Sequence, residues 1–175
     1  MSHSLRLAIY CIPLLLGSCM FGTSGENAWK KAVNHQAKQL GFRNWIVIAE
    51  ASFPAFNRTG IRQINANAEI PEALSYVLQA LDQSQHVHPN IYLTRELRSM
   101  KNEDAPGVDE LRAMLQYTLE SREVSQLEQD SLLTLMADAN RSFDVLIVRT
   151  TSALPYANVF ICLLYTSDAA DEEDS

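Results

Sequence analysis

Two short stretches of the sequence carry side chains that could exchange protons with a hydroxyl-rich ligand. The first is Glu50, which ends the apolar run NWIVIAE (residues 44–50) and opens a loop. The second is PYAN, which contains Tyr156 and Asn158. A carboxylate can accept or donate a proton, and a phenol and an amide supply hydrogen-bond donors and acceptors. The alternative is that all three are ordinary strand-edge groups without a ligand.

Other kinds of chemistry have weaker support in the sequence. The six glycines are scattered, and neither GxGxxG, GxxxxGK[ST] nor GxSxG occurs, so nucleotide chemistry and an α/β-hydrolase nucleophile are not indicated. His86 and His88 in HVHP could begin a metal site, but zinc takes three or four protein ligands and no third is suggested by spacing. We therefore expect solvated loop histidines and no metal.

The elements around Glu50 and PYAN predict an α/β fold. The run 44–50 is apolar and β-branched, as in strands buried on both faces of a parallel sheet, and the loop after such a strand is a common ligand site. Apolar side chains at helical spacing alternate with further short strands. We predict helices over 29–40, from Pro71 to Leu81, over 108–119 and over 132–139, and further strands at 61–66, 90–94, 144–151 and 156–161. This order predicts a single three-layer domain with a mostly parallel sheet over 27–161.

The N-terminus has the features of a secretion signal. One Arg precedes the apolar run LAIYCIPLLLG, which is too short to span a membrane as a helix. The sequence LGSC, ending at Cys19, resembles the bacterial lipobox, in which the Cys becomes the lipidated first residue. We therefore predict a lipoprotein signal peptide over 1–18, a tether over 19–26 and a lipid anchor in the bacterial cell envelope, on the periplasmic side of the inner or outer membrane. An ordinary cleaved signal is the alternative.

The C-terminus changes abruptly in character after Ile161. Residues 162–172, CLLYTSDAADE, resemble one reading frame through a transposon-end sequencing adapter, so 162–175 is predicted to be a non-native tail. A solvated acidic tail is the alternative reading. This segment holds five of the 21 acidic residues, so the net charge of −7 falls to −2 without it. A body so close to neutral gives no electrostatic footprint for nucleic acid.

The composition fits an ordinary globular domain that has to be stabilised by its core. Hydrophobic residues make up 47% of the chain and charged residues 20%, which indicates neither disorder nor a multi-span membrane protein. Cys11 lies in the predicted signal, Cys19 at the lipidation position and Cys162 at the predicted junction with the tail. No disulfide framework therefore remains.

The two stretches that carry Glu50 and PYAN resemble one known family. LGFRNWIVIAEASFP (residues 40–54) resembles a segment of the D-ribose pyranase and L-fucose mutarotase family that reads Leu-Gly-His, a polar pair, an apolar strand, then Asp-Ala-x-x-Pro. LPYANVFI (residues 154–161) resembles the family's final Pro-Tyr-Ala-Asn strand. The order of elements between them also fits, so the resemblance covers about residues 40–161.

The resemblance implies a compact α/β subunit that assembles into a ring and binds a monosaccharide near subunit boundaries, without a cofactor or metal. The implied reaction interconverts ring forms or anomers of a free sugar such as ribose or fucose. By this resemblance Glu50 stands where the family has an aspartate, and Tyr156, Ala157 and Asn158 stand where it contacts sugar. Phe42 stands where the family has its catalytic histidine.

Phe42 divides the functional hypotheses, because a phenyl ring cannot transfer protons although it can stack on the apolar face of a sugar. One hypothesis is a mutarotase-like isomerase that uses Glu50 with Tyr156 or water. A second is a non-catalytic sugar-binding lipoprotein of the same fold. A third is an envelope scaffold with no ligand.

Overall fold

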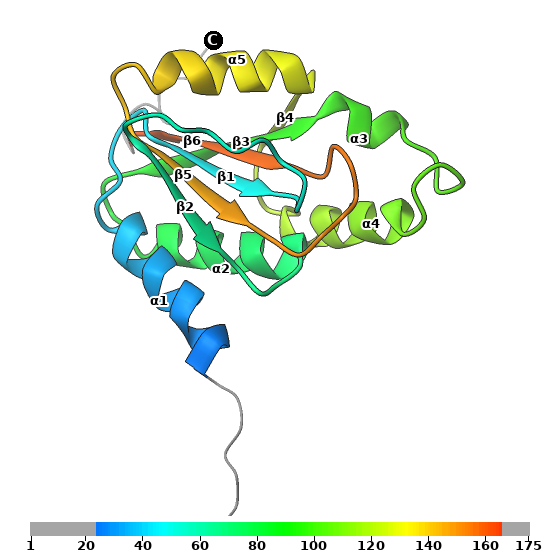
Figure 1. Ribbon diagram of the computed structural model, residues 1–175, viewed down its shortest axis with the longest axis horizontal. Helices are drawn as coiled ribbons and strands as arrows, with labels where there is room; N and C mark the ends of the chain where they lie inside the picture. Colours follow the sequence, from blue (N-terminus) through cyan, green and yellow to red (C-terminus); the bar gives the residue numbers. More distant parts are fainter. Residues whose placement is uncertain (1–23, 166–175) are drawn as a thin grey trace, which may run out of the picture.

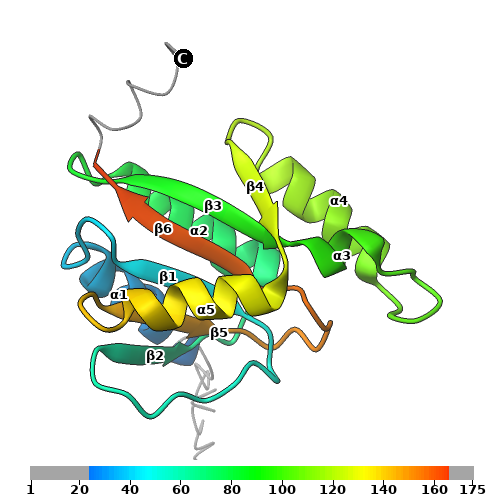
Figure 2. The ribbon, with the colours of Figure 1, turned by 90° about the horizontal axis from the view of Figure 1, so that it is seen from above.

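A six-stranded sheet in the order β2-β5-β1-β6-β3-β4 organises residues 24–165, the part of the chain that this computed structural model describes (Figure 1). Strand β6 is antiparallel to both of its neighbours, β1 and β3, whereas the pairs β1 with β5, β2 with β5 and β3 with β4 are parallel (Figure 2). The predicted α/β class with a mostly parallel sheet is therefore confirmed. The strands are β1 (Trp45–Ala49), β2 (Ile61–Asn65), β3 (His88–Thr94), β4 (Val124–Leu127), β5 (Val145–Arg149) and β6 (Val159–Leu164).

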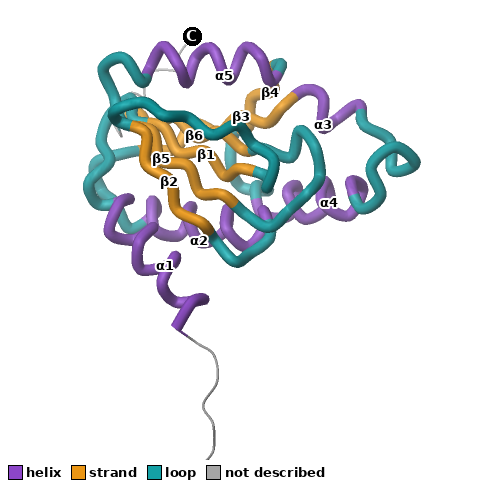
Figure 3. The backbone as a smooth tube through the Cα atoms, viewed as in Figure 1, coloured by secondary structure: helices purple, strands orange, loops and turns teal. Residues whose placement is uncertain are grey.

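Helices cover both faces of the sheet and give the three layers that the sequence predicts. Helix α5 lies on one face, and α1, α2 and α4 lie on the other (Figures 1 and 3). The short helix α3 continues directly from the end of β3. The helices are α1 (Ser24–Ala37), α2 (Ile70–Asp82), α3 (Arg95–Ser99), α4 (Val108–Thr118) and α5 (Gln129–Ala139).

Strand β1 shows why its sequence is apolar at every position. Ile46 and Ile48 belong to the core between the sheet and the α2 face, whereas Val47 belongs to the core beneath α5. All five residues of β1 are buried, because alternate side chains point to opposite faces and both faces are covered. The first residue beyond this buried strand is Glu50. Its carboxylate therefore lies where the parallel strands end, which we call the carboxyl edge of the sheet.

Two elements of the structure, β4 and α3, are not among those predicted from the sequence. Strand β4 reads VSQL and its residues are half-buried or exposed, so it carries no apolar run. Helix α3 has only five residues, too few to show helical periodicity. Helix α1 also begins at Ser24, inside the segment predicted as a tether.

The last strand is shifted from its predicted position. It begins at Val159 rather than Tyr156 and continues past Ile161 to Leu164. Leu163 is fully buried; its N–H donates to the carbonyl of Asn44 at 3.0 Å, and its carbonyl accepts from the N–H of Arg43 at 2.7 Å. Residues 162–164 thus complete the sheet, although the sequence places them in the predicted tail. Cys19 and residues 166–175 lie outside the described part of the chain, and the origin of the tail stays a prediction.

The helices of the domain are short. Within residues 24–165, no helix is both long enough and apolar enough to cross a membrane.

Candidate functional site

Glu50 and Asn158 are brought together at the carboxyl edge of the sheet. The N–H of Glu50 donates to Oδ1 of Asn158 at 2.9 Å. The contact follows from topology: β6 runs antiparallel to β1 with Ile48 opposite Val159, so the end of β1 meets the start of β6. The structure therefore places the two stretches singled out by sequence, 108 residues apart, at one site.

The carboxylate of Glu50 is held on one side only. Glu50 is only 6% exposed. Its Oε2 accepts from the N–H of Ser52 at 2.5 Å and from the Oγ of Ser52 at 2.7 Å. No group in the described part of the chain donates to Oε1. Among the same residues, only the indole nitrogen of Trp29 is fully enclosed without a partner, so Oε1 keeps access to solvent. One carboxylate oxygen is thus available to accept a hydroxyl or a proton.

Asn158 connects three elements rather than facing solvent. Its side chain is 0% exposed, and besides accepting from Glu50 it donates through Nδ2 to Oε1 of Gln129 at 3.0 Å. Gln129 begins α5, and its own N–H donates to the carboxylate of Glu96 at 3.0 and 3.2 Å. Asn158 therefore ties the end of β1 and the start of β6 to the N-terminus of α5. Its predicted contact with sugar stays a prediction.

Tyr156 is held in an unusual backbone conformation beside this network. It has φ of 59°, in the left-handed region that a residue with a Cβ seldom adopts. Its carbonyl accepts from Oγ1 of Thr94 at 2.6 Å, and the same oxygen of Thr94 accepts from the N–H of Leu97 at the start of α3. Tyr156 is 39% exposed, whereas the adjacent Ala157 is buried. Tyr156 is thus partly exposed at the edge that carries Glu50.

The loop after Glu50 is anchored by Arg149 at the end of β5. The guanidinium of Arg149 donates to the carbonyls of Ala51 at 2.8 Å and Phe53 at 2.7 Å. The N–H of Ala51 donates to the carbonyl of Ser152 at 2.7 Å, and the side chain of Phe53 is buried. The backbone that carries Ser52 is therefore fixed by neighbours on both sides.

Phe42 lies away from this cluster, at the opposite edge of the sheet. It precedes β1 and stacks on Tyr165 beyond the end of β6, with centroids 4.1 Å apart, and the guanidinium of Arg43 lies 5.1 Å from its ring centroid. Because β1 and β6 are antiparallel, the residues that precede β1 and follow β6 share one edge, while Glu50 and Tyr156 share the other. One subunit does not bring Phe42 together with the other residues singled out by sequence.

The histidine pair of HVHP forms no cluster with other ligands. Nε2 of His86 lies 3.3 Å from the carbonyl oxygen of Leu40, and His88 begins β3 with an exposed side chain. In the described part of the chain, no group of three or more His, Cys, Asp or Glu residues is arranged to hold a metal ion.

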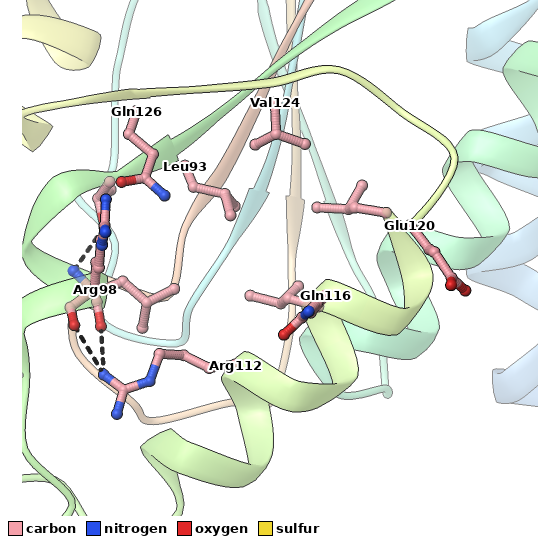
Figure 4. A pocket seen from close by; sticks show the side chains of 11 residues that line it. Leu93, Arg98, Arg112, Gln116, Glu120, Val124 and Gln126 are labelled. Carbon is pink, nitrogen blue, oxygen red and sulfur yellow. Dashed lines mark hydrogen bonds between the residues drawn. The ribbon is translucent and has the colours of Figure 1, made fainter.

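A cavity of about 470 Å³ lies between α4 and the strands β3 and β4 (Figure 4). Leu93 and Val124 line it from the strands, and Gln116 lines it from α4 (Figure 4). Arg112 donates to the carbonyls of Leu97 at 3.0 Å and Arg98 at 3.2 Å, which fixes α3 against α4. None of the sequence-predicted site residues lines this cavity; Thr94 lines it and also bonds Tyr156.

Sequence reasoning missed two residues of the site: Ser52, which donates to Glu50, and Gln129, which accepts from Asn158. Ser52 has a weak signal, since a serine two residues after an acid can donate to its side chain. Gln129 has none, because a polar residue at the start of a helix is common and its partner lies 29 residues away.

Together, the mixed six-stranded sheet and the buried carboxylate beside a Pro-Tyr-Ala-Asn turn define a small α/β protein with a candidate polar site at the carboxyl edge. The model of the RbsD / FucU transport protein family matches residues 27–163, and the chain belongs to this family.

Solved structures share the fold. Bacillus subtilis RbsD complexed with D-ribose is 20% identical, with a TM-score of 0.51, covering 74% of this chain and 91% of that one. The fucose mutarotase from Streptococcus pneumoniae in complex with L-fucose is 16% identical, with a TM-score of 0.51, covering 75% and 90%. FucU from Bifidobacterium longum is 15% identical, with a TM-score of 0.51, covering 78% and 95%. No curated protein matches the sequence.

Proposed function

We propose that this protein binds a free monosaccharide, such as ribose or fucose, at the carboxyl edge of its sheet and interconverts the ring forms or anomers of that sugar. The observation that carries the proposal is Glu50, a buried carboxylate held at Oε2 with no donor at Oε1, at the same edge of the sheet as the partly exposed Tyr156. Family membership and two solved structures whose proteins hold D-ribose or L-fucose support the choice of ligand.

The reaction needs one group to take a proton from the anomeric hydroxyl and another to give a proton to the ring oxygen. In the proposed mechanism Oε1 of Glu50 accepts the hydroxyl proton as the bond between the anomeric carbon and the ring oxygen breaks. Tyr156 or a water molecule protonates the ring oxygen, which yields the open-chain aldehyde. Either face of the aldehyde is then attacked by a sugar hydroxyl, with both proton transfers reversed. No step needs a cofactor or a metal.

The position of Phe42 favours a site built from two subunits of a ring-shaped homo-oligomer. Phe42 and Glu50 occupy opposite edges of one subunit, so they can face one sugar only if neighbouring subunits contribute one each. In this proposal Phe42 of one subunit stacks on the apolar face of the sugar that Glu50 of the next subunit binds.

A second candidate is a non-catalytic sugar-binding protein of the same fold. The observation that favours it is again Phe42, which stands where the resemblance implies a catalytic histidine and which cannot transfer a proton.

For either function, we propose that Cys19 carries the lipid anchor, so that the protein contacts the membrane of the cell envelope only through the lipid. Metabolic labelling with a radioactive fatty acid, in wild type and in Cys19→Ser, tests the anchor; label retained in Cys19→Ser argues against it.

The deciding experiment is saturation-transfer NMR of anomer exchange with ribose, fucose and other monosaccharides, together with a binding measurement for each. The isomerase proposal predicts exchange above the uncatalysed rate that Glu50→Gln reduces to background. Glu103→Gln, an exposed loop acid, is the matched control and leaves exchange unchanged. Binding without exchange identifies the second candidate, and a protein that neither binds nor exchanges any of these sugars contradicts both.

A further inference from the structure

We propose that Ser52 is a positioning residue, which holds the carboxylate of Glu50 so that Oε1 is its single open acceptor for a sugar hydroxyl. The inference deepens the proposed function and rests on it for the identity of the ligand. Neither the resemblance nor the sequence pattern assigns a role to position 52.

Two donors of Ser52 converge on the same atom. The N–H lies 2.5 Å and the Oγ 2.7 Å from Oε2 of Glu50, and both contacts are short, as charge-assisted hydrogen bonds are. Ser52 itself is exposed, whereas Glu50 is buried. An exposed hydroxyl can bond to water instead. That the hydroxyl of Ser52 bonds to the buried Oε2 of Glu50 therefore indicates that it orients the carboxylate.

A glutamate needs such a restraint more than an aspartate does. Residues 50–54 resemble the pattern Asp-Ala-x-x-Pro, in which the acid has one methylene fewer. The additional rotatable bond lets the carboxylate of Glu50 swing by about a bond length, whereas a functional site has to hold its groups to within roughly 0.5 Å. The two bonds from Ser52 restrict this freedom through Oε2 and leave Oε1 as the carboxylate oxygen without a donor.

The donors of Ser52 are themselves held in place without a ligand. The carbonyls on either side of Ser52, those of Ala51 and Phe53, both accept from Arg149. The N–H of Phe53 also donates to the carbonyl of Glu50 at 3.1 Å, which closes the turn. The restraint on Glu50 is therefore built into the subunit and precedes sugar binding.

A sugar-free measurement tests the restraint itself. In ¹H–¹⁵N spectra of the full-length protein, the amide proton of Ser52 is expected far downfield, as for a short bond to a carboxylate, and Glu50→Gln is expected to move it upfield. Ser121→Ala removes a serine hydroxyl from the turn before β4, at the other edge of the sheet, and should leave the Ser52 amide in place. An unperturbed Ser52 amide in Glu50→Gln overturns the inference whatever the sugar results are.

Sugar binding tests what the restraint achieves. Ser52→Ala is expected to weaken the affinity for the sugar about tenfold, as for one hydrogen bond to a charged group, while Ser52→Thr keeps the hydroxyl and restores it. In a Glu50→Gln background Ser52→Ala should have no further effect. An affinity that is unchanged in Ser52→Ala, or lowered equally in both backgrounds, contradicts the positioning role. If the wild type binds no sugar, the proposed function fails and the amide measurement alone decides whether Ser52 holds Glu50.

Discussion

Phe42 stacks on Tyr165 at the edge of the sheet opposite Glu50, with ring centroids 4.1 Å apart and planes 10° from parallel. Strand β1 separates Phe42 from Glu50, and its five residues span on the order of 15 Å at about 3.3 Å per residue. A monosaccharide cannot touch both residues of one subunit. If position 42 contributes to the site, it does so in a neighbouring subunit.

The first prediction concerns a histidine at position 42. Phe42→His supplies a group that titrates near neutral pH and can exchange protons with a sugar hydroxyl. We expect Phe42→His to raise the rate of anomer exchange above that of the wild type, measured by saturation-transfer NMR. An unchanged rate, in a variant that still binds sugar, argues that position 42 does not reach the ligand.

Mixed oligomers show whether the two positions act across a subunit boundary. The double variant Phe42→His/Glu50→Gln has no carboxylate at position 50 and should be inactive alone. Reassembled with wild-type subunits, it places the imidazole introduced at position 42 of one subunit against Glu50 of the next, so exchange should exceed that of either protein separately. A site contained in one subunit predicts no gain on mixing.

The second prediction concerns Asn158, which serves the fold as well as the site. Asn158→Ala leaves the buried N–H of Glu50 and Oε1 of Gln129 without their partner. An unsatisfied buried polar group costs roughly 1–3 kcal/mol, so the free energy of unfolding in urea should fall by about that amount. Asn67→Ala, at an exposed position, is the control and should stay within about 0.5 kcal/mol of the wild type. Equal stability of Asn158→Ala and the wild type would show that water replaces the amide.

Much of the fold could be predicted from sequence, and so could the position of Glu50 at the end of a buried strand. The run ending at Glu50 is short, continuously apolar and rich in β-branched residues, which identifies both a strand buried on two faces and the edge where its last residue lies. Strand β4 could not be predicted because its VSQL residues alternate neither in polarity nor in burial. The direction of β6 could not be predicted either, since an apolar strand pairs with parallel or antiparallel neighbours alike.

The direction of β6 is also what determines which residues meet. An antiparallel β6 places PYAN beside Glu50 and the residues after the strand beside Phe42. The order of the motifs along the chain carries no such information. Phe42 and Glu50 are only eight positions apart, but strand β1 runs between them and places them at opposite edges. Partners of Asn158 such as Gln129 come from a different element and leave no local pattern.

The third prediction concerns Arg149, which anchors the loop that carries Ser52. Arg149→Met keeps much of the aliphatic stem but removes the donors to the carbonyls of Ala51, Phe53 and Pro54. We expect faster amide hydrogen exchange over residues 51–53 and weaker sugar binding, with Arg149→Lys intermediate because one ammonium cannot serve all three acceptors in the geometry of a guanidinium. Arg141→Met removes an arginine with 79% exposed side chain and is the control without effect on this loop. Unaltered amide hydrogen exchange in Arg149→Met would show that the bond from Ala51 to Ser152 and the burial of Phe53 hold the loop without the guanidinium.

The fourth prediction concerns the pH dependence of Cys162 in β6. Burial raises the pKa of this thiol from 9.0 to about 11, and the nearby guanidinium of Arg43 opposes the shift. The thiolate is the nucleophile, so alkylation by iodoacetamide should be slow at about pH 8 and increase until about pH 11. In a Cys11→Ser/Cys19→Ser background Cys162 is the only thiol, and intact-mass measurement follows its reaction.

The same shift predicts how stability changes with pH. The folded state disfavours the thiolate of Cys162. The contribution of the neutral thiol to the free energy of unfolding is therefore complete below the ordinary pKa of 9.0 and is lost as pH rises through about 11.

The matched control for the alkylation experiment is the same variant unfolded in urea, in which alkylation should level off near about pH 9 because the thiol is solvated. Replacing Arg43 with Met removes the opposing charge and should slow alkylation of the folded protein further. A folded protein whose alkylation profile coincides with that in urea would show that β6 does not bury Cys162, and would place the end of the ordered strand before that residue.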